Sequence, residues 1–125
     1  MKEIIITKLA PAPIGPYNQA VKANGFLFIS GQIAISPSSG EVEKSTIDAE
    51  AHQVMQNLKA ILIEAKLGFN NVVKTTILLS SMDLFATVNA IYGSYFESEF
   101  PARETYAVLG LPKNVNIEIS MIAIL

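Results

Sequence analysis

The 125-residue sequence contains no cysteine, and this absence excludes disulfide bonds, thiolate zinc sites and a cysteine nucleophile. Its single histidine cannot form a histidine-based metal cluster, so we expect no metal site. The longest apolar run is far shorter than the roughly 20 residues that span a bilayer, and no segment has the pattern of a signal peptide. These absences predict a cytoplasmic protein that does not insert into membranes.

Positive charge is also scarce and unevenly distributed. The chain has eight lysines and one arginine, Arg103, against 11 acidic residues, which gives a net charge of −2. Because no basic stripe interleaved with aromatic residues is present, we expect no nucleic-acid partner. Half of the residues are apolar and only 16% are charged, a high apolar share for a single domain spanning residues 1–125. The surplus indicates that other subunits cover part of the surface.

The spacing of apolar residues predicts an α+β domain in which two helices pack on one face of a mixed β-sheet. The predicted order is three strands, a helix, a strand, a helix and two strands. Strands are expected at residues 4–6, 19–22, 26–30, 72–81, 105–108 and 115–125. The first helix is expected from a Thr46 cap to a stop around Lys66 and Gly68, and the second from an Asp83 cap to a point before Pro101.

The last predicted strand indicates how the sheet is covered. Its odd-numbered positions, 115–125, are all apolar and are expected to lie under the helices. Its even-numbered positions change from polar to apolar along the strand. A face of this mixed kind is expected where neighbouring subunits cover part of the sheet, so the pattern predicts an oligomer.

Arg103 is the first candidate for a functional residue. It follows Pro101 near the start of a predicted strand, where its planar guanidinium could bind a substrate carboxylate with two hydrogen bonds. The alternative is a surface ion pair with Glu97, Glu99 or Glu104. The use of lysine at every other basic position favours a special role for Arg103, but the spacing alone leaves both interpretations open.

Other candidates also have two interpretations. Gly31, after Ser30 at the end of an apolar strand, suits either the close approach of a ligand or a plain bulge. Tyr17 in a stiff proline-rich loop can cover a pocket or simply pack against its neighbours. Asn89, unfavourable in mid-helix, can cap a neighbouring backbone or reach a site. His52 lies one step from the apolar stripe of the first helix and is interpreted as a half-exposed helix residue.

Seven motifs together resemble a known family. They are IGPYNQA at residues 14–20, ISGQI at 29–33, NLKAI at 57–61, VKTT at 73–76, FATVNAIY at 85–92, PAR at 101–103, and LPKNV with IEI between 111 and 119. In this order and spacing they resemble the Rid family of reactive intermediate/imine deaminases, the RidA-type or YjgF-like proteins. The resemblance covers essentially the whole chain.

The resemblance implies a chorismate-mutase-like fold in a homotrimer, with the sheets forming a central barrel and three sites between subunits. The implied reaction is hydrolysis of 2-imino acids of the 2-iminobutanoate type, and of enamine tautomers such as 2-aminoacrylate, to 2-keto acids and ammonia. No cofactor or metal takes part. Such intermediates are released by pyridoxal-phosphate-dependent dehydratases, so the implied role is control of metabolite damage by binding a small 2-imino or 2-keto acid.

The resemblance also assigns roles to residues. Arg103 would bind the substrate carboxylate, and Tyr17 and Ser30 would line the pocket. The backbone of Gly31 would approach the ligand, and Asn89 would shape the cleft.

The sequence departs from the family at two implied site positions. Position 105, usually Cys with its backbone toward the ligand, is Thr105, and position 120, usually a Glu that activates water, is Ser120. Because serine is a poor general base, the chain can alternatively be a non-catalytic trimeric module that binds a small carboxylate metabolite. Glu118 lies on the same strand face about 7 Å away, which is too far for it to replace position 120. Glu104, beside the arginine, is expected to point away from it.

Overall fold

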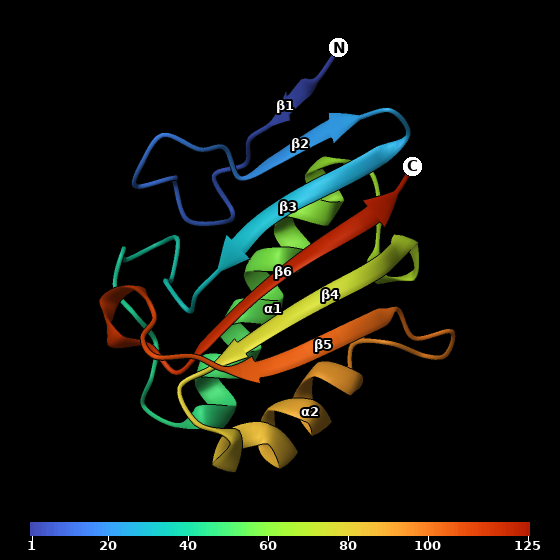
Figure 1. Cartoon of the computed structure of the whole chain (residues 1–125). Helices are drawn as coiled ribbons and strands as arrows, with labels where there is room; N and C mark the ends of the chain where they lie inside the picture. Colours follow the sequence, from blue (N-terminus) through green and yellow to red (C-terminus); the bar gives the residue numbers. More distant parts are fainter.

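The computed structural model describes residues 1–125 as one six-stranded mixed sheet with both helices on the same face (Figure 1). The strands are β1 (Glu3–Ile5), β2 (Ala20–Ala23), β3 (Phe26–Gln32), β4 (Val72–Leu79), β5 (Ala102–Ala107) and β6 (Ile117–Ile124). The helices are α1 (Ile47–Glu64) and α2 (Phe85–Gly93), with short 3₁₀ turns at Phe69–Asn71, Met82–Leu84 and Pro112–Asn114. The predicted fold class and order of elements are confirmed.

The spatial order of the strands is β1-β2-β3-β6-β4-β5. Every neighbouring pair is antiparallel except β4 and β5, which run parallel. Parallel neighbours need a crossover connection, and α2 with its flanking segments supplies it. The mixed sheet therefore follows from placing a helix between β4 and β5.

The core lies between the sheet and α1. The odd-numbered positions of β6 are buried, as their alternation predicts, and α1 contributes a stripe that is fully enclosed. Thr46 caps α1 as expected, because its side chain accepts a hydrogen bond from the backbone N–H of Ala49 at 3.0 Å. No helix is both long and apolar enough to cross a membrane.

The opposite face of the sheet carries no helix and faces the viewer in Figure 1. The even-numbered side chains of β6 change on this face from Glu118 and Ser120 to Ile122 and Ile124, as the sequence predicts. Phe28 opposes Ile122 in the neighbouring strand and is 45% exposed. The open face therefore combines a polar half with an apolar half that lacks a covering layer.

The second helix and the strand after it differ from the prediction. Ser81, rather than Asp83, accepts the capping hydrogen bond, and it caps the 3₁₀ turn that precedes α2. The helix stops at Gly93 because the chain turns to pack Phe96 against Tyr92, with ring centroids 4.9 Å apart. Strand β5 then begins at Ala102, three residues before the predicted start, because its pairing with β4 begins there.

The stop of α1 also differs from the prediction. The helix ends at Glu64, and Lys66 itself takes the left-handed conformation with φ 63°. Gly68, the expected stop, is extended. The connection to β4 therefore begins earlier, and is longer, than a stop at Gly68 predicts.

Candidate functional site

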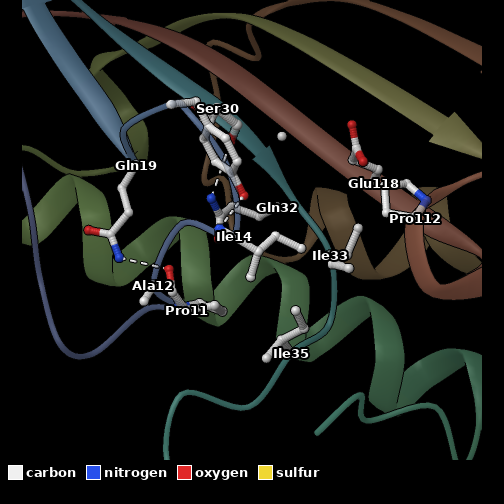
Figure 2. Close-up of a pocket in the computed structure, with 12 residues that line it drawn as sticks. Pro11, Ala12, Ile14, Gln19, Ser30, Gln32, Ile33, Ile35, Pro112 and Glu118 are labelled. Atoms are coloured by element: carbon white, nitrogen blue, oxygen red, sulfur yellow. Dashed lines mark hydrogen bonds between the residues drawn. The ribbon is translucent and has the colours of Figure 1, made fainter. Parts of the chain in front are cut away.

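A hollow of about 410 Å³ opens between the loop that follows β1, the end of β3 and the start of β6 (Figure 2). Pro11, Ile14, Ile33 and Ile35 form an apolar wall on one side. Tyr17, Ser30, Gly31 and Glu118 also line the hollow, and this set is called the pocket half below. The structure thus brings together three of the residues predicted from the sequence, with Glu118 added.

Gly31 is where the backbone leaves room for a carboxylate. A Cβ atom added to Gly31 would lie 2.8 Å from Cδ of Glu118, closer than such atoms approach in proteins. The register of β3 against β6 shifts between Ile29 and Gln32, so a bulge surrounds Gly31. The bulge interpretation is confirmed, and it re-aims the backbone so that the Glu118 side chain lies directly over it.

The Glu118 carboxyl group is partly withdrawn from water and has no protein hydrogen-bond donor or cation beside it. Burial raises the pKa of this carboxyl above its usual value near 4.5. A carboxylate with a raised pKa is a stronger base than an exposed one. The pocket half therefore holds a group suited to general acid–base chemistry.

Two hydrogen bonds join the loop side of the pocket to β3. The Ser30 hydroxyl donates to the backbone oxygen of Asn18 at 2.6 Å, and the Ser30 N–H donates to the backbone oxygen of Gln19 at 2.9 Å. Tyr17 accepts a long hydrogen bond of 3.4 Å from the Ile14 N–H. Its hydroxyl proton is left free to donate to a bound molecule.

Arg103 lies on β5 and projects toward α2 on the helix-covered face. Its Nη1 donates to Oδ1 of Asn89 at 2.7 Å, and its guanidinium carbon lies 5.6 Å and 5.3 Å from the ring centroids of Phe85 and Tyr92. The Asn89 side chain thus contacts a side chain rather than capping a neighbouring backbone, and its place in a binding site stays a prediction. Asn89, Arg103 and Thr105 are called the arginine half below.

The surface ion pair that the sequence left open for Arg103 is absent. The structure contains one salt bridge, which joins Lys74 Nζ to Glu104 Oε1 at 3.1 Å. Glu104 also accepts a hydrogen bond from the Thr76 hydroxyl and points away from the arginine, as predicted. These two contacts lower the pKa of Glu104 below its usual value, the bond from Thr76 being the larger cause. The positive charge of Arg103 therefore has no acidic partner in this chain.

Thr105 is one strand repeat beyond Arg103, on the same face of β5. Its hydroxyl oxygen is buried and has no hydrogen-bond partner. Its surroundings include Asn89 and Arg103, and the space there has no room for a water molecule. The Thr105 hydroxyl is thus a buried polar group without a hydrogen-bond partner in the chain.

Ser120 lies apart from both halves. It is on the open face, opposite Thr76, near Phe28 and Lys74. The pocket contains instead Glu118, two residues earlier on the same face. The expectation that Glu118 is too far to act was based on its distance from position 120, but the pocket forms around Glu118 itself.

The two halves do not meet within one chain. Glu118 is on β6 and Arg103 is on β5, and β4 between them puts these strands about 10 Å apart at the usual strand spacing. Arg103 also projects to the helix-covered face, since it pairs with buried Thr75, whereas Glu118 projects to the open face. Within one chain, Arg103 and Glu118 therefore do not face a common space.

The structure shows no group of three His, Asp or Glu side chains that could hold a metal ion.

Two further residues, His52 and Gln19, were considered for the site. His52 is exposed and contacts the Tyr95 hydroxyl at 2.7 Å, outside both halves. Gln19, which sequence reasoning missed, lines the pocket and is 1% exposed. The only sequence signal that could have indicated Gln19 is the position of a polar residue directly after a proline-rich loop.

Comparison with known proteins agrees with these observations. The family described as endoribonuclease L-PSP matches residues 7–125. A mouse protein named 2-iminobutanoate/2-iminopropanoate deaminase is 47% identical over 124 residues, which cover 99% of this chain and 92% of that protein. The chain belongs to the Rid family, also called the YjgF/RidA family.

Solved structures of the family match over nearly the whole chain. A Rid family protein from Yersinia pestis has a TM-score of 0.97 and 42% identity, with complete coverage of both chains. TdcF from E. coli, whose crystal structure contains bound serine, has a TM-score of 0.94 and 36% identity, with 98% coverage of both chains. The sequence resemblance to the Rid family is thus confirmed.

Proposed function

We propose that this protein hydrolyses small 2-imino acids and their enamine tautomers to 2-keto acids and ammonia, in a homotrimer whose sites lie between subunits. The observation that carries the proposal is that the chain holds both a partly buried, unpartnered carboxylate on Glu118 and an arginine, Arg103, that has no acidic partner. The name of the mouse relative supports this class of reaction. In this proposal the protein removes reactive intermediates in the cytoplasm.

The chemistry needs one base that later acts as an acid. Water attacks C2 of the protonated imine while the Glu118 carboxylate takes one proton from that water. The resulting carbinolamine then receives the proton from Glu118 on its nitrogen. As the C–N bond breaks, ammonia leaves, the hydroxyl proton passes to the Glu118 carboxylate and the C2 oxygen becomes the keto oxygen. Release of that proton to solvent returns Glu118 to its starting form. The raised pKa of Glu118 suits these proton transfers.

Arg103 supplies binding and orientation. A guanidinium fork donates two parallel hydrogen bonds to a carboxylate, and Asn89 and two aromatic rings already hold this fork in place. Because Asn89 is neutral, it positions the arginine without cancelling its charge. Fixing the carboxylate of the imino acid in this way orients C2 toward the water held by Glu118.

The trimer is supported by two features of the single chain. The open face exposes apolar side chains that include Phe28, Phe26 and Ile124, each at least 38% exposed. The carboxylate of the pocket half projects from the open face of central strand β6, whereas Arg103 projects from the opposite face of edge strand β5. Packing one copy against the next would cover the apolar surface and bring Arg103 of one chain to Glu118 of another.

Two other activities have weaker support. The alternative of a non-catalytic carboxylate-binding module was based on the serine at position 120, which is a poor general base. Because the Glu118 carboxylate lines the pocket, the serine at position 120 gives this alternative little support. The family's description as an endoribonuclease suggests RNA cleavage, yet the net charge of −2 and the single arginine offer little attraction for a phosphate backbone.

The proposal is tested by a coupled assay. Threonine dehydratase generates 2-iminobutanoate from threonine, and the appearance of 2-ketobutanoate is followed with and without the purified protein. We expect faster release with the protein, and an acceleration that rises with pH through a pKa above 4.5, as Glu118 loses its proton. Release that is no faster than with an equal mass of serum albumin would contradict the proposal.

A further inference from the structure

The side chain of Gln19 is enclosed by the loop that covers the pocket. It is 1% exposed, and its amide makes four hydrogen bonds to three loop residues. Its Oε1 accepts from the Thr7 N–H at 2.7 Å. Its Nε2 lies 3.0 Å from the Thr7 oxygen, 3.2 Å from the Ala10 oxygen and 2.9 Å from the Pro11 oxygen. With two hydrogens for three acceptors, the amide has no unused donor.

Apart from the bond from Ser30 to Asn18 and the burial of Ala10, few contacts hold this loop, residues 6–18, to the body of the protein. It contains no strand or helix, and its three prolines have no N–H to donate. Its one internal backbone hydrogen bond runs from Tyr17 to Gly15. Figure 2 shows the Gln19 side chain reaching Pro11 beneath the pocket. The amide thus supplies the loop with the bonds that its own backbone lacks.

The same loop forms one side of the site. It contributes Pro11, Ala12, Ile14 and Tyr17 to the pocket lining, whereas Glu118 comes from β6. We propose that Gln19 is a positioning residue for the reaction. It acts through the loop, by holding Tyr17 and the apolar wall against the substrate. This inference rests on the function proposed for the pocket.

Two substitutions separate the roles of the amide. Gln19→Glu keeps the size but replaces the donor nitrogen by an oxygen that faces three carbonyl oxygens. Gln19→Met keeps similar bulk and removes all four hydrogen bonds. Gln56→Glu and Gln56→Met are the matched controls, because Gln56 lies on the exposed side of α1 and does not line the pocket.

Kinetics distinguish positioning from a general loss of structure. Because the loop must be ordered again on each binding event, both Gln19 variants are expected to raise KM about tenfold and to change kcat less than about threefold. A role in folding alone would lower the active fraction, and therefore kcat, with an unchanged KM. That result, or a KM equal to that of the Gln56 controls, would overturn the inference.

The pH dependence gives a second distinguishing readout. A carboxyl at position 19 has a raised pKa, because burial and three carbonyl oxygens disfavour its charged form. When protonated it can donate one hydrogen bond, so the KM defect of Gln19→Glu should shrink as pH falls through that pKa. The defect of Gln19→Met should not change. Equal pH dependence of the two variants would overturn the inference.

Limited trypsin digestion tests the loop without reference to catalysis. Lys8 is in the loop and Lys113 is in the turn before β6, and both are exposed. Cleavage after Lys8 should become at least several-fold faster in both Gln19 variants, while cleavage after Lys113 stays unchanged. Unchanged cleavage after Lys8 would overturn the inference. If the wild-type protein is inactive but shows this cleavage pattern, the proposed reaction is contradicted. The conclusion that Gln19 holds the loop in place would still stand.

Discussion

The pocket half and the arginine half of the site differ in how the fold prepares them. Glu118 has no hydrogen-bond donor from the protein and lies over a glycine in a hollow. Arg103 is held by Asn89 at 2.7 Å and by two aromatic rings. The carboxylate is thus left ready to exchange a proton, and the guanidinium is fixed in direction. The contrast is the basis for proposing that the first half carries the chemistry and the second half anchors the substrate.

The largest effect is expected within the pocket half. Glu118→Gln keeps the side-chain shape but removes the base, so kcat should fall by about 10² to 10⁴-fold with little change in KM. Ser120→Ala is the matched comparison, because Ser120 projects from the same strand face two residues away. It should leave kcat within about threefold of wild type. Steady-state kinetics in the dehydratase assay measure kcat and KM of both variants. A larger loss of kcat in Ser120→Ala than in Glu118→Gln would contradict the assignment of the base to Glu118.

A change in the arginine half should act mainly on binding. Arg103→Ala removes a charged fork aimed at a carboxylate, so KM should rise by about 10²-fold. Arg103→Lys retains the charge but not the fork, and its KM should be intermediate. Binding of 2-ketobutanoate, measured by calorimetry, should weaken in parallel. A fall in kcat at unchanged KM would show that the arginine takes part in the chemical step instead.

A smaller effect is expected at Gly31, where the backbone of β3 meets the Glu118 carboxylate. Gly31→Ala places a methyl group against the Glu118 carboxylate, which must swing aside, so kcat should drop by about tenfold. Gly110→Ala is the control, because a Cβ there meets no atom within 4 Å. Equal activity of the two variants would mean that Glu118 does not act from its observed position.

The smallest effect on activity is expected at Thr105. Replacing its buried, unpartnered hydroxyl by a methyl in Thr105→Val should raise the free energy of unfolding by about 1 kcal/mol. Because only the backbone of this residue is expected to face the ligand, kcat/KM should stay within about twofold of wild type. Thermal unfolding and the coupled assay measure the two quantities. A large loss of activity would assign the hydroxyl itself to the site.

The fold was predictable because its signals are local. Alternation in the last strand and the Thr46 cap follow from the periods of strands and helices, and both are present. The early stop of α2 was not predictable, because Phe96 packs against Phe69 in the 3₁₀ turn before β4 as well as against Tyr92 of α2. Pattern analysis does not register contacts between aromatic rings that are distant along the chain.

The site was predictable only in part. Tyr17, Ser30 and Gly31 were recognised and lie together in the pocket. The choice between Glu118 and Ser120 could not be made from alternation, because both lie on one face of the same strand. It depends on how the β3 bulge turns the backbone, since Ser120 lies across from the bulge in the strand register but the Glu118 side chain is the one that lies over Gly31. A bulge shifts register without an unambiguous sequence signal.

The claim that the two halves meet only between subunits is tested most directly by complementation. Arg103→Ala and Glu118→Gln chains are co-expressed with different tags, and trimers that carry both tags are purified. In every such trimer one of the three sites pairs an intact arginine half with an intact pocket half, so about one third of wild-type activity should return. Mixed trimers no more active than either variant alone would contradict the claim and place both halves in one chain's site.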